Sequence, residues 1–327
     1  MLNYARFQAE MSKPIVPQTW DDGSNETVLK TPYYKFRKFP SLAGFVQERC
    51  ITLFPPHAGR HPNIVNGLIR VCQEEGYDTF VFELLPATHK TRDVSLADLV
   101  YFGKECFNFP SQKKILMGVC QGLWHSILVA EKPVAQFGFA GPVDFHAGDG
   151  YIKKSCQQTP MVIPKFIVGL NGGVQPAWVQ WWNFTLGNPW AVFIDEPMKL
   201  FQYIRKGEEE KINNWHRNRS WYYSPQSLAG SWFVEAIERF FKNNELKEIV
   251  DFKSFDWPLF LYAGENDEIT PPVQTFAMAD LVSSKLVKKH LFQNCGHTAT
   301  FCKKEPLEKV RKDLKLISGL KGEGYAG

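Results

Sequence analysis

Hydrophobic and polar positions in the first half of the chain follow two alternating patterns. Four short apolar runs predict buried strands: residues 50–54, 79–82, 115–119 and 134–140. Between and after them, apolar residues at helical spacing predict three helices: residues 64–75, 96–107 and 123–130. Strands that alternate with helices favour a parallel sheet covered by helices. The pattern therefore predicts the α/β class.

The alternation stops near residue 146. From there to about residue 250 the chain is rich in aromatic residues and mostly helical or irregular in pattern, and seven of its ten tryptophans lie in this stretch. Strand patterns return at residues 258–262 and 288–292, and a final helix is expected over residues 306–317. We therefore expect a core formed by residues 1–145 and 251–327, with residues 146–250 inserted as a helical cap.

Composition and charge exclude several classes of function. The chain has 38 Lys and Arg against 34 Asp and Glu, interspersed, so nucleic-acid binding is not expected. Seven cysteines without a CxxC motif indicate reduced thiols and a cytoplasmic protein. No charge occurs between Lys165 and Asp195, but Pro176 and Pro189 interrupt this stretch, so no transmembrane helix is expected.

The main chemical signal is the G-x-C-x-G box at residues 118–122, between the third strand and the helix that follows it. A strand, a sharp turn with the reactive residue, and a helix are typical of a nucleophile elbow, whose flanking glycines permit close backbone approach. Here the central residue is Cys120. A thiol in this position indicates acyl transfer through a covalent acyl-enzyme.

A cysteine nucleophile needs a base, and the base needs a carboxylate that orients it. Asp267 follows the strand at 258–262 and His297 follows the strand at 288–292, in the order nucleophile, acid, histidine. Cys120, Asp267 and His297 are therefore the predicted catalytic triad. Asp144 is the chief alternative acid because it also follows a strand, and Glu268 is a weaker one.

The remaining cysteines and the substrate contacts are assigned by position. Cys50, Cys72, Cys106 and Cys156 are expected to be packing residues, because an isolated buried cysteine usually acts as a small hydrophobe. Cys295 and Cys302 flank His297 but lie in no such box, and they are expected to be packing residues as well. The oxyanion hole is predicted from the backbone N–H of Gln121 and of Ala58, the latter in the loop after the first strand.

His57, in the same loop as Ala58, is a further candidate for substrate binding, although Pro55 to His57 could instead form only a stiff turn. Trp178 and Trp182 would line an apolar entrance in the cap; the alternative is that the tryptophans form the cap's own core. No cofactor and no metal ion are expected.

These segments together resemble the α/β-hydrolase family that includes polyhydroxyalkanoate synthases and intracellular polyhydroxyalkanoate depolymerases. Beyond the cysteine box, the resemblance rests on several segments between about residues 45 and 300: residues 54–56, 76–81, 92–93, 142–145, 251–253, 264–267, 270–272 and 296–297. It implies an α/β-hydrolase fold, a mostly parallel sheet with an inserted cap, and a hydrophobic acyl ester or polyester as substrate.

Two departures favour the hydrolytic branch of this family. Glu268 stands where the synthases carry a histidine after the catalytic aspartate, and Leu123 stands where they typically carry a glycine. Cleavage of polyhydroxyalkanoate or related hydroxyacyl esters is therefore the first expectation. A synthase-type acyltransferase that uses a hydroxyacyl-coenzyme A thioester is the second, and a non-catalytic granule-binding protein is the third. The resemblance also implies a homodimer or a partner subunit, and association with granules.

Overall fold

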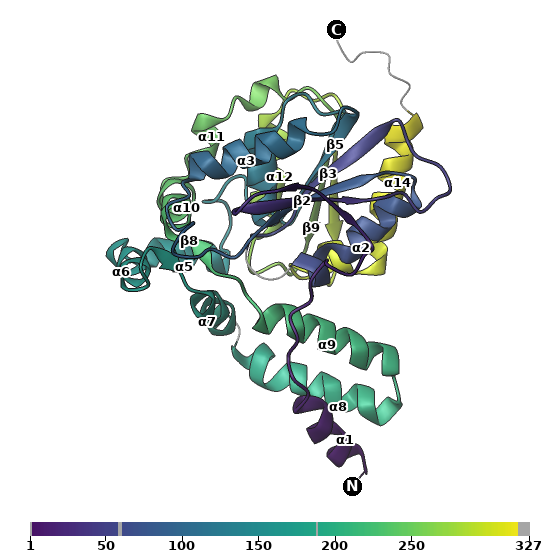
Figure 1. The fold of residues 1–327 in the computed structure, drawn as a ribbon, viewed down its shortest axis with the longest axis vertical. Coiled ribbons are helices and arrows are strands. Elements are labelled where there is room, and N and C mark those ends of the chain that lie inside the picture. Colours follow the sequence, from purple (N-terminus) through teal and green to yellow (C-terminus); the bar gives the residue numbers. More distant parts are fainter. Residues whose placement is uncertain (1, 58–60, 188, 320–327) are drawn as a thin grey trace.

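The computed structural model describes residues 2–57, 61–187 and 189–319 (Figure 1). Its centre is an eight-stranded sheet in the order β1-β2-β4-β3-β5-β6-β9-β10. The strands are β1 (Glu26–Lys30), β2 (Tyr34–Phe39), β3 (Arg49–Phe54), β4 (Thr79–Leu84), β5 (Lys113–Val119), β6 (Ala135–Phe139), β9 (Leu259–Gly264) and β10 (Val287–Phe292). All neighbours from β4 to β10 pair in parallel, whereas β2 pairs antiparallel with β1 and β4. The predicted α/β class is confirmed.

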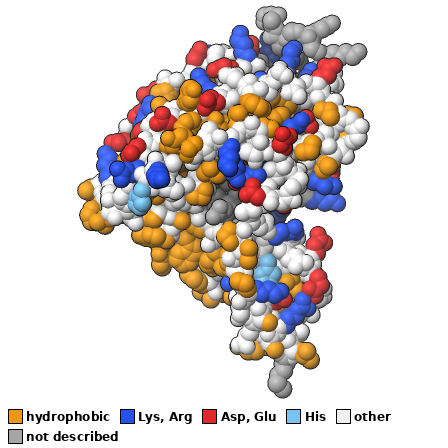
Figure 2. All heavy atoms as spheres, viewed as in Figure 1, with side chains coloured by type: hydrophobic (Ala, Val, Ile, Leu, Met, Phe, Trp, Pro, Cys, Tyr) orange, Lys and Arg blue, Asp and Glu red, His pale blue; other side chains and the backbone are white. Residues whose placement is uncertain are grey.

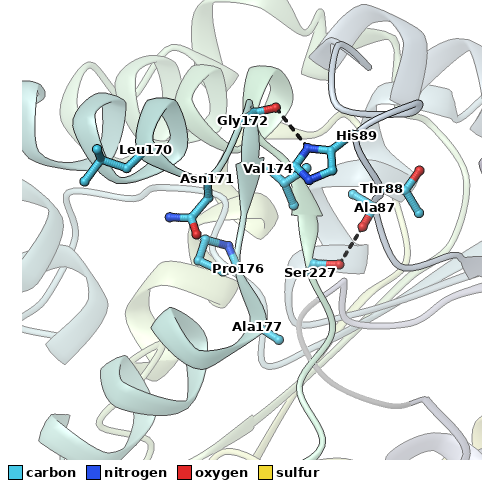
Figure 3. Close-up of a pocket in the computed structure, with 10 residues that line it drawn as sticks. All are labelled: Ala87, Thr88, His89, Leu170, Asn171, Gly172, Val174, Pro176, Ala177 and Ser227. Carbon is cyan, nitrogen blue, oxygen red and sulfur yellow. Dashed lines mark hydrogen bonds between the residues drawn. The ribbon is translucent and has the colours of Figure 1, made fainter.

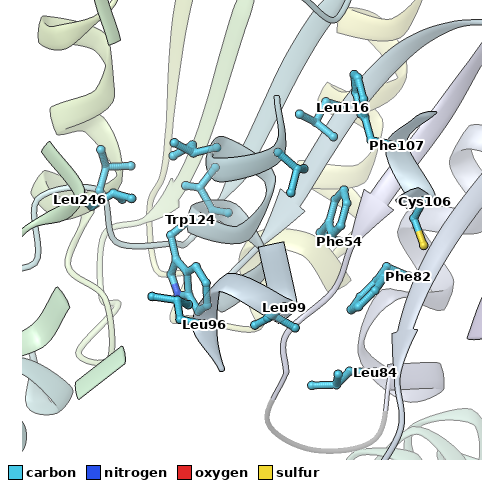
Figure 4. Packing of buried hydrophobic residues seen from close by; sticks show 14 of the residues in the cluster. Phe54, Phe82, Leu84, Leu96, Leu99, Cys106, Phe107, Leu116, Trp124 and Leu246 are labelled. Atoms are coloured by element: carbon cyan, nitrogen blue, oxygen red, sulfur yellow. The ribbon is translucent and has the colours of Figure 1, made fainter. Parts of the chain in front are cut away.

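Helices cover both faces of this sheet, because each strand in its centre is apolar on both sides. One hydrophobic cluster joins the sheet to α2 (His61–Glu74), α13 (Ala299–Cys302) and α14 (Lys304–Gly319). A second cluster joins the other face to α3 (Leu96–Asn108), α4 (Gln121–Val129) and α12 (Pro272–Leu281). Figure 4 shows part of the second cluster, to which β3 contributes Phe54, α3 contributes Leu99 and α4 contributes Trp124.

The predicted strands and helices of the core occur within a few residues of their expected bounds. The hairpin of β1 and β2 was not expected, because β2 has the sequence YKFRKF and a cation lies in its middle. That cation, Arg37, is only 2% exposed and forms ion pairs with Asp21 and Glu83. An arginine can be buried when its charge is paired in this way. A search for apolar patterns does not identify such a buried position.

The chain between β6 and β9 contains residues 146–250, the stretch that the sequence predicts as a cap. It consists of α5 (Tyr151–Gln158), α6 (Val162–Leu170), β7 (Val174–Gln175), α7 (Ala177–Gly187), η1 (Ala191–Asp195), α8 (Glu196–Lys206), α9 (Glu209–Tyr223), β8 (Leu228–Ala229), α10 (Gly230–Ala236), η2 (Ile237–Lys242), α11 (Leu246–Ile249) and η3 (Phe252–Ser254). The pair α8 and α9 extends away from the sheet (Figure 1). Of the helices that the structure describes, none combines the length and the apolar character needed to cross a bilayer.

Two sets of contacts cross the expected boundaries of this insertion. The first helix, α1 (Leu2–Met11), packs on α8: the rings of Phe7 and Phe201 lie 5.6 Å apart, and Glu10 accepts a hydrogen bond from His216 of α9 at 2.7 Å. Trp232 of α10 is buried in the same cluster as α3. The division at residues 145 and 250 therefore stays a prediction. Both α1 and α10 form contacts across it.

Candidate active site

Cys120 lies at the sharp turn between β5 and α4. Its backbone angles, φ 53° and ψ −120°, are in a region that residues other than glycine rarely adopt. Its N–H donates to Phe139 O at 2.8 Å, and its carbonyl accepts from Leu123 N at 3.0 Å, so both sides of the strained residue are held. Cys120 immediately precedes α4.

The glycines of the box are required by close backbone approach. A Cβ atom on Gly122 would lie 1.9 Å from the carbonyl oxygen of Phe54, at the end of β3. A Cβ atom on Gly118 would lie 2.6 Å from the carbonyl oxygen of Gly122. The end of β3 and the start of α4 therefore come together only because these positions have no side chain.

Asp267 and His297 follow β9 and β10 and come into direct contact. Nδ1 of His297 lies 2.8 Å from Oδ2 of Asp267, and the two side chains are 9% and 0% exposed. Oδ1 of Asp267 accepts hydrogen bonds from the backbone N–H groups of Ile269 at 3.0 Å and Thr270 at 2.9 Å. The carboxylate is therefore fixed by its own loop and faces the imidazole.

Thr270 is a third member of this contact that sequence reasoning did not assign. Its Oγ1 lies 3.0 Å from Nδ1 of His297 and 3.2 Å from Oδ2 of Asp267, and it donates to the carbonyl of Ala140 at 2.8 Å. The hydroxyl thus links the acid and the base to the end of β6. The spacing Asp-x-x-Thr, in which the carboxylate caps the threonine N–H, is the sequence signal that could have found it.

The electrostatics of His297 connect it to Cys120. Burial lowers the pKa of His297, but the charges of Asp267 and Cys120 and hydrogen bonds to both outweigh it, so the pKa lies well above its ordinary value. Because Asp267 and Thr270 occupy Nδ1, Nε2 is left for the thiol. A raised pKa favours the protonated form of His297, and an adjacent histidine is the group that activates a cysteine nucleophile.

The other cysteines are in different surroundings. Burial raises the pKa of Cys50 to about 11 and that of Cys156 to about 12, and it raises the pKa values of Cys72 and Cys106 as well. A thiol with a raised pKa is a poor nucleophile at neutral pH. Cys120, by contrast, is partly exposed and lies beside a histidine.

The alternative acid, Asp144, has other partners. Its carboxylate accepts hydrogen bonds from Lys247 at 2.7 Å and from Asn244 at 2.8 Å, both near α11. Burial raises the pKa of Asp144, yet these two partners and the N–H of His146 lower it overall. Asp144, at the start of the insertion, is therefore bound to residues near its end. Glu268, the weaker alternative acid, is exposed.

Only part of the predicted oxyanion hole lies within the described residues. Gln121 is the first residue of α4, directly after Cys120, whereas Ala58 lies outside the described residues. The side chain of His57 is fully buried, and its ring packs against Trp124, His125 and Trp232. This packing favours a structural role for the His57 ring over contact with substrate.

Trp178 and Trp182 are 54% and 47% exposed, one helical turn apart on α7. They belong to a larger apolar face over α6 and α7, which Figure 2 shows as a gathering of hydrophobic side chains. Its exposed members include Val162, Phe166, Leu170, Trp178, Trp182 and Leu186. The tryptophans at 178 and 182 thus face solvent, which disfavours the alternative that they form the cap's own core.

A pocket of about 690 Å³ opens beside this face (Figure 3). Leu170 and Ala177 line one side, and Ala87, His89 and Ser227 line the other. The residues of the predicted triad are not among those that line it. Within the described part of the chain, no group of three or more His, Cys, Asp or Glu side chains is arranged to hold a metal ion.

Comparison with solved structures identifies the architecture. A soluble variant of monoglyceride lipase from Saccharomyces cerevisiae, in complex with a substrate analogue, is similar with a TM-score of 0.58 and 13% identity, over 94% of this chain and 98% of that one. A monoacylglycerol lipase from Paleococcus ferrophilus gives 0.57 and 13%, over 87% and 98%. The chain has the α/β-hydrolase fold. The mouse alpha/beta hydrolase domain-containing protein 10 is similar as well, at 0.54 and 13%, over 91% and 100%.

Sequence comparison gives one distant relative. A poly(3-hydroxyalkanoate) polymerase subunit from Haloferax mediterranei is 21% identical over 235 residues, which make up 67% of this chain and 47% of that protein. The chain thus spans about half the length of this relative. No family model matches the sequence.

Proposed function

We propose that this α/β-hydrolase chain cleaves ester bonds of polyhydroxyalkanoate or of related hydroxyacyl esters, with Cys120 as nucleophile, His297 as base and Asp267 as the orienting acid. The observation that carries the proposal is the position of His297, which contacts Asp267 at 2.8 Å and hydrogen-bonds Cys120 on the strained turn before α4. Nucleophilic catalysis of this type uses a nucleophile, a base and a group that orients the base. Three loops that are distant in sequence supply these groups here.

The chemistry follows from the contacts. The sulfur of Cys120 attacks the ester carbonyl carbon, and the N–H groups of Gln121 and Ala58 stabilise the oxyanion. Each such donor typically contributes about 10²–10³ in rate. Collapse breaks the bond to the alcohol oxygen, which takes a proton from His297, and leaves an acyl-cysteine. His297 then takes a proton from water, and the resulting hydroxide attacks the thioester carbonyl. The C–S bond breaks, the hydroxy acid leaves, and His297 gives its proton to the departing thiolate of Cys120.

The substrate class is supported by the apolar surface near the insertion. Trp178 and Trp182 project from α7 into solvent, and no charged residue occurs between residues 166 and 194. An uncharged, largely aromatic face fits an acyl chain or polyester better than a small polar ester. Within this proposal the protein works in the cytoplasm at the surface of polymer granules, as a homodimer or with a partner subunit.

A synthase-type acyltransferase is the second candidate, and the distant polymerase subunit favours it. In that case the acyl group comes from hydroxyacyl-coenzyme A, and a chain hydroxyl instead of water attacks the acyl-cysteine. Glu268, which is exposed beside the acid loop, counts against this candidate because the synthases carry a histidine there. A non-catalytic granule-binding protein is the third candidate, and the contact of His297 with both partners counts against it.

The deciding experiment gives the purified protein two substrates in separate reactions. With amorphous polyhydroxybutyrate we expect soluble hydroxy acids, and with hydroxybutyryl-coenzyme A we expect little polymer. Cys120→Ala is the control for both reactions. Coenzyme A release together with insoluble polymer would reverse the order of the first two candidates. Binding to polymer without any product, unchanged in Cys120→Ala, would establish the third.

A further inference from the structure

The pocket beside the apolar face over α6 and α7 lies between the core and the insertion (Figure 3). On the core side it is lined by residues 87–89, in the segment that follows β4. On the insertion side its wall is formed by residues between 170 and 177 and by Ser227. Its volume of about 690 Å³ is within the range of about 300–1,000 Å³ that is usual for small-molecule sites.

The pocket lies at the edge of the sheet that also carries the nucleophile. β4 runs parallel to β3, and β3 to β5, so the carboxyl ends of these strands meet at one edge. Open α/β sheets bind their ligands outside this edge. Cys120 follows β5, and residues 87–89 follow β4. Gln226, the neighbour of Ser227, also donates from Nε2 to the carbonyl of His57 after β3, at 2.7 Å. A ligand in the pocket is therefore held on the catalytic side of the sheet.

The lining of the pocket favours an uncharged ligand. Of the described residues that line it, none is Asp, Glu, Lys or Arg. Arg92 contacts the same segment, but its guanidinium donates to the carbonyl of Gly172 at 3.2 Å and pairs with Asp93 at 3.5 Å. A charged group that leaves water here meets no lysine, arginine or carboxylate in the lining, and an unpaired charge is costly to bury.

The apolar part of the lining continues onto the surface of the molecule. Leu170, Val174 and Ala177 line the pocket. Leu170 also belongs to the apolar face over α6 and α7, and Trp178 of that face follows Ala177 directly. An acyl chain that enters the pocket can therefore cover apolar side chains outside it as well, which removes more apolar surface from water.

The polar groups of the pocket are left mainly as hydrogen-bond acceptors. Nδ1 of His89 lies 3.4 Å from the carbonyl oxygen of Gly172, which can only accept, so Nε2 of the neutral ring is an acceptor. Nδ2 of Asn171 donates to a carbonyl of α6 at 2.7 Å, which leaves Oδ1 for a ligand. The hydroxyl of Ser227 donates to a backbone carbonyl at 2.7 Å, which leaves the lone pairs of Oγ. An ester carbonyl cannot donate to these acceptors, whereas a hydroxyl group can.

We propose that this pocket is a second binding site, separate from the triad, for the hydroxyl end of an uncharged hydroxyacyl chain. The terminal hydroxyl donates to the acceptors of His89 and Asn171, and the alkyl groups pack against Leu170 and the apolar face beyond it. The ligand class rests on the proposed function, in which Cys120 cleaves hydroxyacyl esters. A chain held by one end stays close to the catalytic edge of the sheet, which raises the effective concentration of its ester groups there.

The test is calorimetric titration of the full-length Cys120→Ala protein, which has no nucleophile to cleave the ligand. Two ligands are compared: the methyl ester of the hydroxybutyrate trimer with a free hydroxyl end, and the same ester with that hydroxyl acetylated. Both are uncharged, and only the first can donate a hydrogen bond. We expect the acetylated trimer to bind about tenfold more weakly.

Variants on the same background place this binding in the pocket. His89→Ala should weaken binding of the free trimer by about tenfold. Lys90→Ala is the matched control, because Lys90 is the exposed next residue and is not among those that line the pocket. It should bind both trimers as the parent does. Ala177→Phe, which fills the pocket from the start of α7, should also weaken binding and serves if His89→Ala does not fold.

Each other outcome has a definite meaning. Equal affinity for the two trimers would overturn the proposal, as would equal affinity of His89→Ala and Lys90→Ala for the free trimer. If the wild-type protein degrades polymer but this pattern of binding is absent, the pocket assignment fails alone. If the pattern is present but the wild-type protein cleaves no ester, the proposed function fails and the binding site stands.

Discussion

Nδ1 of His297 lies 2.8 Å from Oδ2 of Asp267, in a pair whose carboxylate is fully shielded from water. Burial alone would lower the pKa of the imidazole, yet Asp267 and Cys120 raise it well above its ordinary value. The imidazolium is therefore favoured at neutral pH. Its contribution to folding stability is fully present below the unfolded histidine pKa of about 6.5, and it is lost as the pH rises through the raised pKa of the folded state.

The first prediction concerns this pair. Asp267→Asn should shift the pKa of His297 downward, because the carboxylate is a principal cause of the rise. The imidazole should then lose its proton at a lower pH, which NMR titration of the ring would measure. Hydrolysis should fall strongly, by about 10⁴-fold in comparable triads. Asp144→Asn is the control: it removes a carboxylate that pairs with Lys247 and should leave the His297 titration unchanged. An identical titration in both variants would contradict the assignment of Asp267.

The second prediction concerns the choice among seven cysteines. Limiting iodoacetamide at neutral pH should label Cys120 first, because burial raises the pKa of Cys50, Cys72, Cys106 and Cys156. Cys295 is buried. Cys302 is an exposed residue, but its thiol donates a hydrogen bond to the Ile64 carbonyl at 3.2 Å, and its pKa is raised to about 12. Peptide mass mapping identifies the labelled site.

The matched variant for labelling is Cys120→Ala, which should abolish both the rapid label and ester cleavage. It should retain the wild-type circular dichroism spectrum, because the turn is held by backbone hydrogen bonds to Phe139 and Leu123. Ester cleavage that survives in this variant would remove the central part of the proposed function.

Much of the fold was accessible from sequence because the parallel strands β3 to β6 are buried on both faces. Continuous apolar runs bounded by helical patterns identify such strands. The antiparallel strand β2 was not predicted, because Arg37 interrupts its apolar pattern. The charge of Arg37 can be buried because it forms ion pairs with Asp21 and Glu83. Partners of this kind are distant in sequence and cannot be found by local periodicity.

The candidate site was predictable to the extent that chemistry and chain order determine it. Cys120, Asp267 and His297 follow strand ends in a recognisable order, and the structure brings them together. Thr270 was not predicted. The Asp-x-x-Thr spacing signals its capped N–H, but its hydroxyl meets His297 and the carbonyl of Ala140, which lie far away in the sequence. The buried ring of His57 illustrates the same limit: position in a loop does not determine which way a side chain faces.

The third prediction concerns Thr270. Thr270→Val removes the hydroxyl that links His297 and Asp267 to the carbonyl of Ala140. We expect kcat to fall by about tenfold with little change in KM, because the base loses part of its orientation and substrate contacts are untouched. The free energy of unfolding should fall by about 1 kcal/mol, as for one net hydrogen bond.

Thr275→Val is the control for that experiment. Thr275 is fully buried on α12, and its hydroxyl donates to the carbonyl of Gly141 at 2.9 Å, one residue beyond Ala140. It should lose a similar free energy of unfolding but keep the wild-type kcat. Equal losses of kcat in the two variants would assign Thr270 to stability alone.

The last prediction concerns the glycine after the nucleophile. In Gly122→Ala the new methyl group would lie 1.9 Å from the carbonyl oxygen of Phe54 and 2.8 Å from that of Pro55, and backbone atoms cannot turn aside as a flexible side chain can. The start of α4 must therefore move away from β3. We expect a loss of about 1–3 kcal/mol in the free energy of unfolding, as for overpacked cores. We also expect the acylation rate to fall by more than this destabilisation explains, because Cys120 moves with α4.

Gly169→Ala in α6, where a methyl group meets nothing within 4 Å, is the matched variant and should be neutral or more stable by up to about 1 kcal/mol. Urea unfolding of both variants and active-site titration with p-nitrophenyl butyrate measure the two effects. If Gly122→Ala folds as stably as Gly169→Ala and acylates at the wild-type rate, the close approach of β3 and α4 does not position the nucleophile.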